Sequence, residues 1–162
     1  MTTVVLLAGP PAAGKTTVAR RVADGIRLRH SLPAVIHVEV DDLRHMIVGN
    51  GTEDPRAWLR LTTAVIDASL DLSPFVVVDG LFWEEASLQA MRDRYDVRAF
   101  ALHADMATRV ARDRERLPAD ERLGSGELHR LAEASGWATC ERIDASRDPD
   151  AVALDILARL FR

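Results

Sequence analysis

Short apolar runs alternate with amphipathic segments along the whole chain. The apolar runs predict β-strands at Thr3–Ala8, Ala34–Glu39, Phe75–Asp79, Val97–Leu102 and Thr139–Ile143. Between the first two runs, Val18, Val22 and Ile26 recur at the spacing of one helix face. Such alternation is typical of parallel βαβ units. We therefore expect a single α/β domain over residues 1–162, with a five-stranded parallel sheet and helices on both faces.

The amphipathic segments predict helices between the strands. The first helix begins at Lys15, and the last one follows Asp148-Pro149. The segments between them are Asp41–Val48, Arg56–Leu72, Trp83–Arg94, Met106–Arg116 and Gly126–Ser135. In open α/β sheets, ligands bind beyond the carboxyl ends of the strands. Side chains that directly follow a strand are therefore the candidates for function.

The first strand leads into the most specific motif of the chain. Residues Gly9–Thr16 form a complete G-x-x-x-x-G-K-[ST] loop, and a helix follows directly. Backbone N–H groups of such a loop surround a polyphosphate at the positive end of the helix. We expect the nucleotide to contact Gly9, Pro10, Pro11, Ala12, Ala13, Gly14, Lys15, Thr16 and Thr17. Lys15 would reach the β- and γ-phosphates, and the Thr16 hydroxyl would ligate Mg²⁺.

The second strand is followed by charged residues, among them Asp41, Asp42 and Arg44. A carboxylate at Asp41 would lie near the γ-phosphate and accept the proton of an acceptor hydroxyl. Arg44, one turn further along the same helix face, would bind an anionic or carbonyl group of that acceptor. Two alternatives stay open from the residues alone: Asp41 or Asp42 is only a helix N-cap, or the two exchange roles.

The third strand, Phe75–Asp79, ends in an aspartate. An apolar strand that ends in Asp beside a phosphate-binding loop is typical of a residue that holds Mg²⁺. Aspartate is also common in turns, but the loop at Gly9–Thr16 favours the metal role for Asp79. Phe82 and Trp83 follow, and they would either line the acceptor pocket or pack beneath the next helix.

We expect a short lid at residues 105–126, which are rich in arginine. Arg109 and Arg112 share a helix face, and positive charge that closes over phosphates stabilises phosphoryl transfer and excludes water. The alternative is a solvated surface helix whose arginines pair with interleaved acids. After the fifth strand, the segment that ends at Arg147 would surround the adenine or serve only as a connection.

Composition narrows the class of protein. Of the 162 residues, 48% are hydrophobic and 28% are charged, as in globular domains. The net charge is −4, so we expect neither nucleic acid nor an anionic membrane as a partner. No apolar run approaches the roughly 20 residues that span a bilayer. With a single cysteine, Cys140, and no basic leader, the chain is expected to be cytoplasmic. Nothing in it indicates an oligomeric state.

Four segments together resemble the small P-loop kinases: Gly9–Thr16, Val-Asp-Asp-Leu-Arg at 40–44, Val78-Asp79-Gly80, and the pair Arg109 and Arg112. That group includes chloramphenicol phosphotransferase, zeta-toxin-like kinases, adenylylsulfate kinase and AAA-type ATP-binding kinase-like proteins. The resemblance covers nearly the whole chain and implies a three-layer sandwich with strand order 2-3-1-4-5. It also implies that Asp41 and Arg44 are the base and a substrate-binding residue. Arg109 would pack on the adenine, and Arg112 would contact the phosphates during catalysis.

These observations predict an ATP-dependent kinase that uses Mg²⁺ and transfers the γ-phosphate to a hydroxyl of a small molecule, such as an antibiotic or other metabolite. A guanine-reading Asn-Lys-x-Asp motif is absent from the sequence, which favours ATP over GTP. Two other functions stay open: a nucleoside or nucleotide kinase, and an ATPase-like regulator without a phosphate acceptor. The motifs do not name the acceptor.

Overall fold

A five-stranded parallel sheet forms the centre of the molecule. The computed structural model describes residues 2–48, 55–80, 85–116 and 137–162. The strands are β1 (Thr3–Ala8), β2 (Ile36–Glu39), β3 (Phe75–Asp79), β4 (Asp96–His103) and β5 (Glu141–Asp144). They pair in parallel in the order β2-β3-β1-β4-β5. The predicted fold class and strand order are therefore confirmed.

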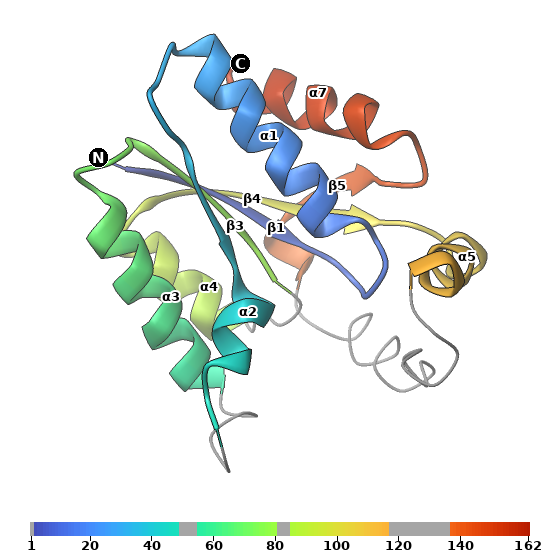
Figure 1. The fold of residues 1–162 in the computed structure, drawn as a ribbon, viewed down its shortest axis with the longest axis horizontal. Coiled ribbons are helices and arrows are strands. Elements are labelled where there is room, and N and C mark those ends of the chain that lie inside the picture. The colour runs from blue at the N-terminus through green and yellow to red at the C-terminus, as the bar shows by residue number, and fades with distance from the viewer. Residues whose placement is uncertain (1, 49–54, 81–84, 117–136) are drawn as a thin grey trace.

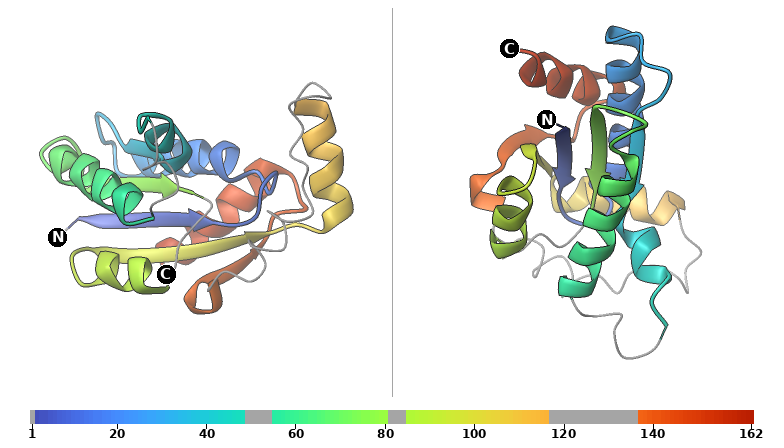
Figure 2. Two further views of the ribbon diagram at one scale, coloured as in Figure 1. Left: turned by 90° about the horizontal axis from the view of Figure 1, so that it is seen from below. Right: turned by 90° about the vertical axis from the view of Figure 1, so that its left-hand side faces the viewer.

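Helices cover both faces of this sheet. They are α1 (Lys15–Arg29), α2 (Val40–His45), α3 (Pro55–Ser69), α4 (Glu85–Arg92), α5 (Met106–Arg116) and α7 (Pro149–Leu160). Figure 1 shows α1 and α7 on one face, with α3 and α4 on the other. In the view from below in Figure 2, α5 lies beyond the ends of the strands. The helix predicted at Gly126–Ser135 lies outside the described residues. None of the described helices has the length and apolar character needed to cross a membrane.

Two predicted strands begin later than the sequence pattern suggests, because pairing with a neighbour decides where a strand starts. Strand β5 begins at Glu141, which pairs with Phe100 of β4. The residues just before it, Trp137–Thr139, form a short 3-10 helix instead. Strand β2 begins at Ile36, which pairs with Val76 of β3. Apolar residues at the edge of a sheet extend beyond the paired segment, so composition alone overestimates its length.

Alternate side chains of β1 pack into opposite layers. Val5 and Leu7 are fully buried in a cluster with α1 and α7. Val4 and Leu6 are fully buried on the other face, in a cluster that includes Trp58 of α3. A strand covered on both faces has no polar side to present to water, which explains the continuous apolar run that predicted it.

The first layer is held together by close packing of α1 against α7. A Cβ atom at Gly25 of α1 would collide with Leu157 Cδ1 of α7, so the two helices approach where a side chain is absent. Helix α7 begins with a side-chain cap: the Asp150 amide donates to Asp148 Oδ1 over 2.9 Å, and Pro149 occupies the first helical turn. Helix α7 therefore packs along α1, the helix that begins at Lys15.

We predict that Ile26→Ala lowers the free energy of unfolding by about 2–5 kcal/mol, because it leaves a cavity in the α1–α7 layer. Ile26 is fully buried there. The control is Leu28→Ala on the same helix, where the side chain is 68% exposed and a change below about 0.5 kcal/mol is expected. Urea unfolding followed by circular dichroism measures both. Equal losses for the two variants would contradict the assigned packing.

Candidate functional site

The loop between β1 and α1 has an unusual backbone. Gly9, Ala12 and Gly14 all have positive φ, at 150°, 59° and 89°. At Gly9, a Cβ atom would lie 2.6 Å from the Leu102 carbonyl oxygen, so only glycine fits between β1 and β4. The Ala13 amide donates to the Pro10 carbonyl over 3.2 Å, which closes the turn. The loop is therefore wrapped tightly at the amino end of α1, as the motif predicts.

Lys15 lies against this loop. Its side chain is buried to 8% exposure, and its Nζ donates to the Pro10 carbonyl over 3.1 Å. An ammonium held across a loop of backbone amides adds fixed positive charge to the positive end of a helix. The arrangement suits a polyanion such as a triphosphate.

Thr16 contacts two carboxylates from neighbouring strands. Its hydroxyl lies 3.0 Å from Glu39 Oε1 and 3.1 Å from Asp79 Oδ1. The register of β2 against β3 brings the two acids together, because Glu39 pairs with Asp79. We call Thr16, Glu39 and Asp79 the carboxylate cluster. A hydroxyl has one proton and can donate to only one of the two acids at a time, so acceptors exceed donors here.

The carboxylate cluster suits Mg²⁺. Its hydroxyl and carboxylate oxygens are hard donors of the kind that Mg²⁺ prefers, and a divalent cation would offset the repulsion between the two acids. Within the described part of the chain, no group of three or more His, Cys, Asp and Glu side chains forms a metal site by itself. Mg²⁺ usually keeps several waters and binds one or two carboxylates together with substrate phosphates. A Mg²⁺ site in which nucleotide phosphates supply the remaining ligands is consistent with this preference.

Two further side chains surround the cluster. Arg20 approaches Glu39 with a distance of 3.4 Å between Nη2 and Oε2. His37 Nε2 lies 2.6 Å from Asp79 Oδ2. Glu39 and His37 were not identified from the sequence. Both alternate with apolar residues in β2, which marks them as one face of a strand, but their contact with Asp79 depends on pairing between strands that are far apart in the sequence.

Asp41 and Arg44 lie on α2, which directly follows Glu39. Their side chains are 3.4 Å apart between Arg44 Nη1 and Asp41 Oδ1. The N-cap of α2 is Glu39, without a side-chain capping bond, so neither Asp41 nor Asp42 is the N-cap residue. The Asp41 side chain is 48% exposed and the Arg44 side chain 26%. This leaves the Asp41 carboxylate accessible to a ligand, while its geometry is restrained by Arg44.

Arg44 is supported from the other side by α3. Its guanidinium carbon lies 5.0 Å from the centre of the Trp58 ring, a cation–π contact. Trp58 is buried to 5% exposure. Sequence reasoning missed Trp58 because an apolar residue inside a predicted helix is usually core. The contact restricts Arg44 to the side of α2 that faces α3.

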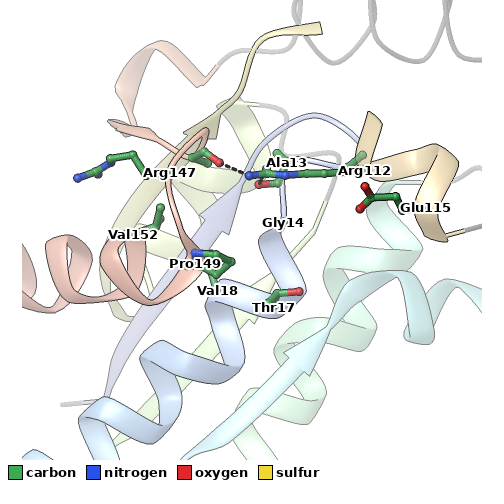
Figure 3. Close-up of a pocket in the computed structure, with 11 residues that line it drawn as sticks. Ala13, Gly14, Thr17, Val18, Arg112, Glu115, Arg147, Pro149 and Val152 are labelled. Carbon is green, nitrogen blue, oxygen red and sulfur yellow. Dashed lines mark hydrogen bonds between the residues drawn. The ribbon is translucent and has the colours of Figure 1, made fainter. Parts of the chain in front are cut away.

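A pocket of about 260 Å³ opens beside the loop, between α1, α5 and α7 (Figure 3). Its walls come from the Gly9–Thr16 loop and α1, from α5, and from the segment between β5 and α7. The lining residues are Ala12, Ala13, Gly14, Thr17, Val18, Arg112, Glu115, Ala145, Arg147, Pro149 and Val152. Walls that are mostly small and apolar, with a few charged groups, are typical of small-molecule binding sites.

Arg112 spans this pocket. It donates to the Ala13 carbonyl over 3.4 Å and to the Ala145 carbonyl over 2.9 Å. Figure 3 shows its side chain extending from α5 across the loop. Arg109 is not among the lining residues, and its side chain is buried to 1% exposure. The predicted contacts of Arg109 with adenine and of Arg112 with phosphates stay predictions. In this structure, Arg112 is the arginine that joins the loop to the pocket.

Asp105 and Asp144 order the two segments that frame the pocket. Asp105 precedes α5, and the Thr108 amide donates to Asp105 Oδ1 over 2.7 Å, which lowers the pKa of this carboxyl. Asp144 follows the same pattern at the end of β5, where hydrogen bonds from the Ser146 hydroxyl and amide lower its pKa. Arg147 donates from Nε to the Asp144 carbonyl over 3.2 Å. Arg147 therefore lines the pocket from a well-ordered turn.

Several predicted residues lie outside the described part of the chain. These are Phe82, Trp83 and residues 117–126 of the expected lid. Residues 105–116 of the lid segment are described, and Met106–Arg116 is helical as predicted. The assignment of Phe82 and Trp83 to the acceptor pocket stays a prediction.

A family model described as an AAA domain matches residues 4–135 of the chain. No curated protein matches it by sequence. The match includes the Gly9–Thr16 loop, Asp41, Asp79 and Arg112.

Solved structures of small kinases have a similar fold. A sugar kinase from Janibacter sp. HTCC2649 aligns with a TM-score of 0.72 at 18% identity, over 99% of this chain and 95% of that chain. A gluconokinase from Sinorhizobium meliloti 1021 aligns with a TM-score of 0.65 at 20% identity, over 98% of this chain and 93% of that chain. A shikimate kinase from Aquifex aeolicus vf5 aligns with a TM-score of 0.62 at 17% identity, over 98% of this chain and 96% of that chain. At these identities the likeness concerns the fold, and it confirms the architecture implied by the resemblance.

We predict opposite outcomes for two substitutions in the loop. Gly9→Ala places a Cβ against the Leu102 carbonyl and should lower the melting temperature and weaken ATP binding at least tenfold. Ala12→Gly, where φ is already 59°, should be tolerated, because glycine adopts this conformation at no steric cost. Calorimetric titration with ATP and thermal unfolding test both. Tolerance of Gly9→Ala would contradict the loop geometry.

Proposed function

The chain belongs to the AAA domain family, and we propose that it is an ATP-dependent phosphotransferase that moves the γ-phosphate to a hydroxyl of a small molecule. One observation carries the proposal. The phosphate-binding loop, the carboxylate cluster and the pair Asp41 and Arg44 all lie at the carboxyl edge of one sheet. A loop alone would indicate only nucleotide binding, whereas a carboxylate on α2, beside the cluster, adds a group suited to the acceptor.

The loop residues bind and orient ATP. Backbone groups of Gly9–Thr16 and the Lys15 ammonium hold the phosphates, and the pocket lined by Thr17, Arg112 and Arg147 receives the base. Thr16 and Asp79, with Glu39, would hold Mg²⁺. When bound, Mg²⁺ offsets the charge of the phosphate oxygens during transfer. These roles leave the chemistry at the acceptor to residues on α2.

Asp41 acts on the acceptor hydroxyl. Its carboxylate orients the hydroxyl toward the γ-phosphate and takes its proton as the new P–O bond forms and the bond to the ADP oxygen breaks. Arg44, held between Asp41 and Trp58, binds an anionic or carbonyl group of the acceptor. Arg112 neutralises charge that develops on the phosphates, and α5 helps to exclude water.

The acceptor is proposed only as a class. Gluconokinase and shikimate kinase, two of the structural neighbours, are named for hydroxylated acids. A small hydroxylated metabolite, including an antibiotic, suits the Arg44 side of the site. We also propose that the protein acts in the cytoplasm, where ATP is plentiful, and that it binds neither nucleic acid nor a membrane.

A panel of acceptors tests the activity. The protein is incubated with MgATP and gluconate, shikimate, simple sugars, nucleosides or chloramphenicol, and ³¹P NMR and mass spectrometry identify phosphorylated product. Acceptor-dependent product supports the proposal. ADP and inorganic phosphate without any phosphorylated acceptor would favour an ATPase-like regulator instead.

We predict that Asp41→Asn lowers the transfer rate by about 10²–10⁴-fold while ATP binding is retained, because the amide cannot accept the proton. Asp42→Asn is the matched control, since Asp42 is exposed and adjacent. Lys15→Ala, in contrast, should abolish nucleotide turnover. For all three variants, product formation gives the transfer rate and calorimetric titration gives the affinity for ATP. A large loss for Asp42→Asn with none for Asp41→Asn would mean that the two residues have exchanged roles.

A further inference from the structure

His37 faces the carboxylate cluster from the edge strand of the sheet. Strand β2 alternates, so Ile36 and Val38 pack in the α3–α4 layer while His37 and Glu39 point toward α1. His37 pairs in register with Val77, two residues before Asp79. From this position its Nε2 lies 2.6 Å from Asp79 Oδ2. The contact joins two adjacent strands at the point where the sheet ends.

Both oxygens of Asp79 are engaged. Oδ1 lies 3.1 Å from the Thr16 hydroxyl, and Oδ2 is the atom that contacts His37. An ionised carboxylate only accepts hydrogen bonds, so the histidine nitrogen is the donor. Asp79 is buried to 2% exposure. Rotation of its carboxylate would break one bond or the other, and water has little access to replace either.

The two outer contacts of the cluster differ in strength. Arg20, which approaches Glu39, has a side chain that is 68% exposed and lies 3.4 Å away. The His37 side chain is 17% exposed and the Asp79 side chain 3%, at 2.6 Å. Exposed pairs contribute little, whereas a short bond between a half-buried histidine and a buried carboxylate restrains both groups. Of these two contacts, the histidine is therefore the one that can fix a carboxylate orientation.

We propose that His37 is a positioning residue that holds the Asp79 carboxylate so that Oδ1 faces the cation beside Thr16. This inference rests on the proposed function, in which Asp79 and Thr16 hold Mg²⁺ together with ATP. Partners of metal-binding side chains typically change metal affinity by about 10–100-fold when they are removed. His37 thus tunes how strongly Mg²⁺ and ATP bind together, without contacting either.

The experiment compares ATP binding with and without the cation. Calorimetry measures the dissociation constant of ATP in EDTA and at saturating MgCl₂, and a MgCl₂ titration at fixed ATP gives the midpoint for Mg²⁺. His37→Leu removes the donor at similar size. His37→Gln keeps a nitrogen donor at comparable reach, and His37→Asn keeps polarity but shortens the reach.

We predict that His37→Leu and His37→Asn raise the Mg²⁺ midpoint about 10–100-fold, with ATP binding in EDTA within about twofold of the wild type. His37→Gln should restore the midpoint to within a few-fold. The control is His30→Leu, at the far end of α1, where the ring contacts Phe75 and Phe161. It should lower thermal stability without moving the midpoint.

The outcomes separate the two proposals. An unchanged Mg²⁺ midpoint in His37→Asn, or an equal loss of ATP affinity with and without Mg²⁺, would overturn the role of His37 and leave the proposed function standing. A wild-type protein that binds ATP equally well in EDTA and in MgCl₂ would instead remove the cation site itself. If His37→Leu fails to fold, the difference in Mg²⁺ midpoint between His37→Gln and His37→Asn tests the role of His37.

Discussion

The site depends on one crowded contact, in which a single hydroxyl of Thr16 lies between two carboxylates. Three separate parts of the chain meet there: the amino end of α1, the end of β2 and the end of β3. Each brings an oxygen that water would otherwise solvate. Two acids in such a place repel each other unless a cation or a donor lies nearby. The fold supplies Arg20 beside the outer oxygen of Glu39 and His37 beside the outer oxygen of Asp79.

Much of this arrangement follows from the parallel sheet. Because all five strands run the same way, their carboxyl ends meet at one edge, and the loops that follow them share one space. The core below is divided between two layers, with β1 buried on both sides. Rigid layers matter for the site, since the carboxylate cluster spans three elements and tolerates little relative movement among them.

The sequence was informative where the chemistry is local. The loop at Gly9–Thr16, Asp79 at a strand end and the buried face of α1 could be predicted, because each depends on residues close together in the chain. Glu39 and His37 were missed because their partner Asp79 is distant in sequence, and Trp58 was missed because an apolar residue inside a predicted helix is usually core. Glu39 meets Asp79 only through the register of β2 and β3, and Trp58 meets Arg44 only through the packing of α3 on α2. The two edge strands, β2 and β5, also begin later than predicted, because pairing with a neighbouring strand rather than hydrophobicity decides where a strand begins.

The bridge made by Arg112 has a consequence for ligand binding in the pocket. Its guanidinium donates to the carbonyls of Ala13 and Ala145. A ligand that draws Arg112 away must replace these bonds, so the net gain is the difference between two sets of hydrogen bonds. The hydrogen bonds of Arg112 are therefore exchanged rather than newly made, which limits how tightly any ligand of this arginine is held.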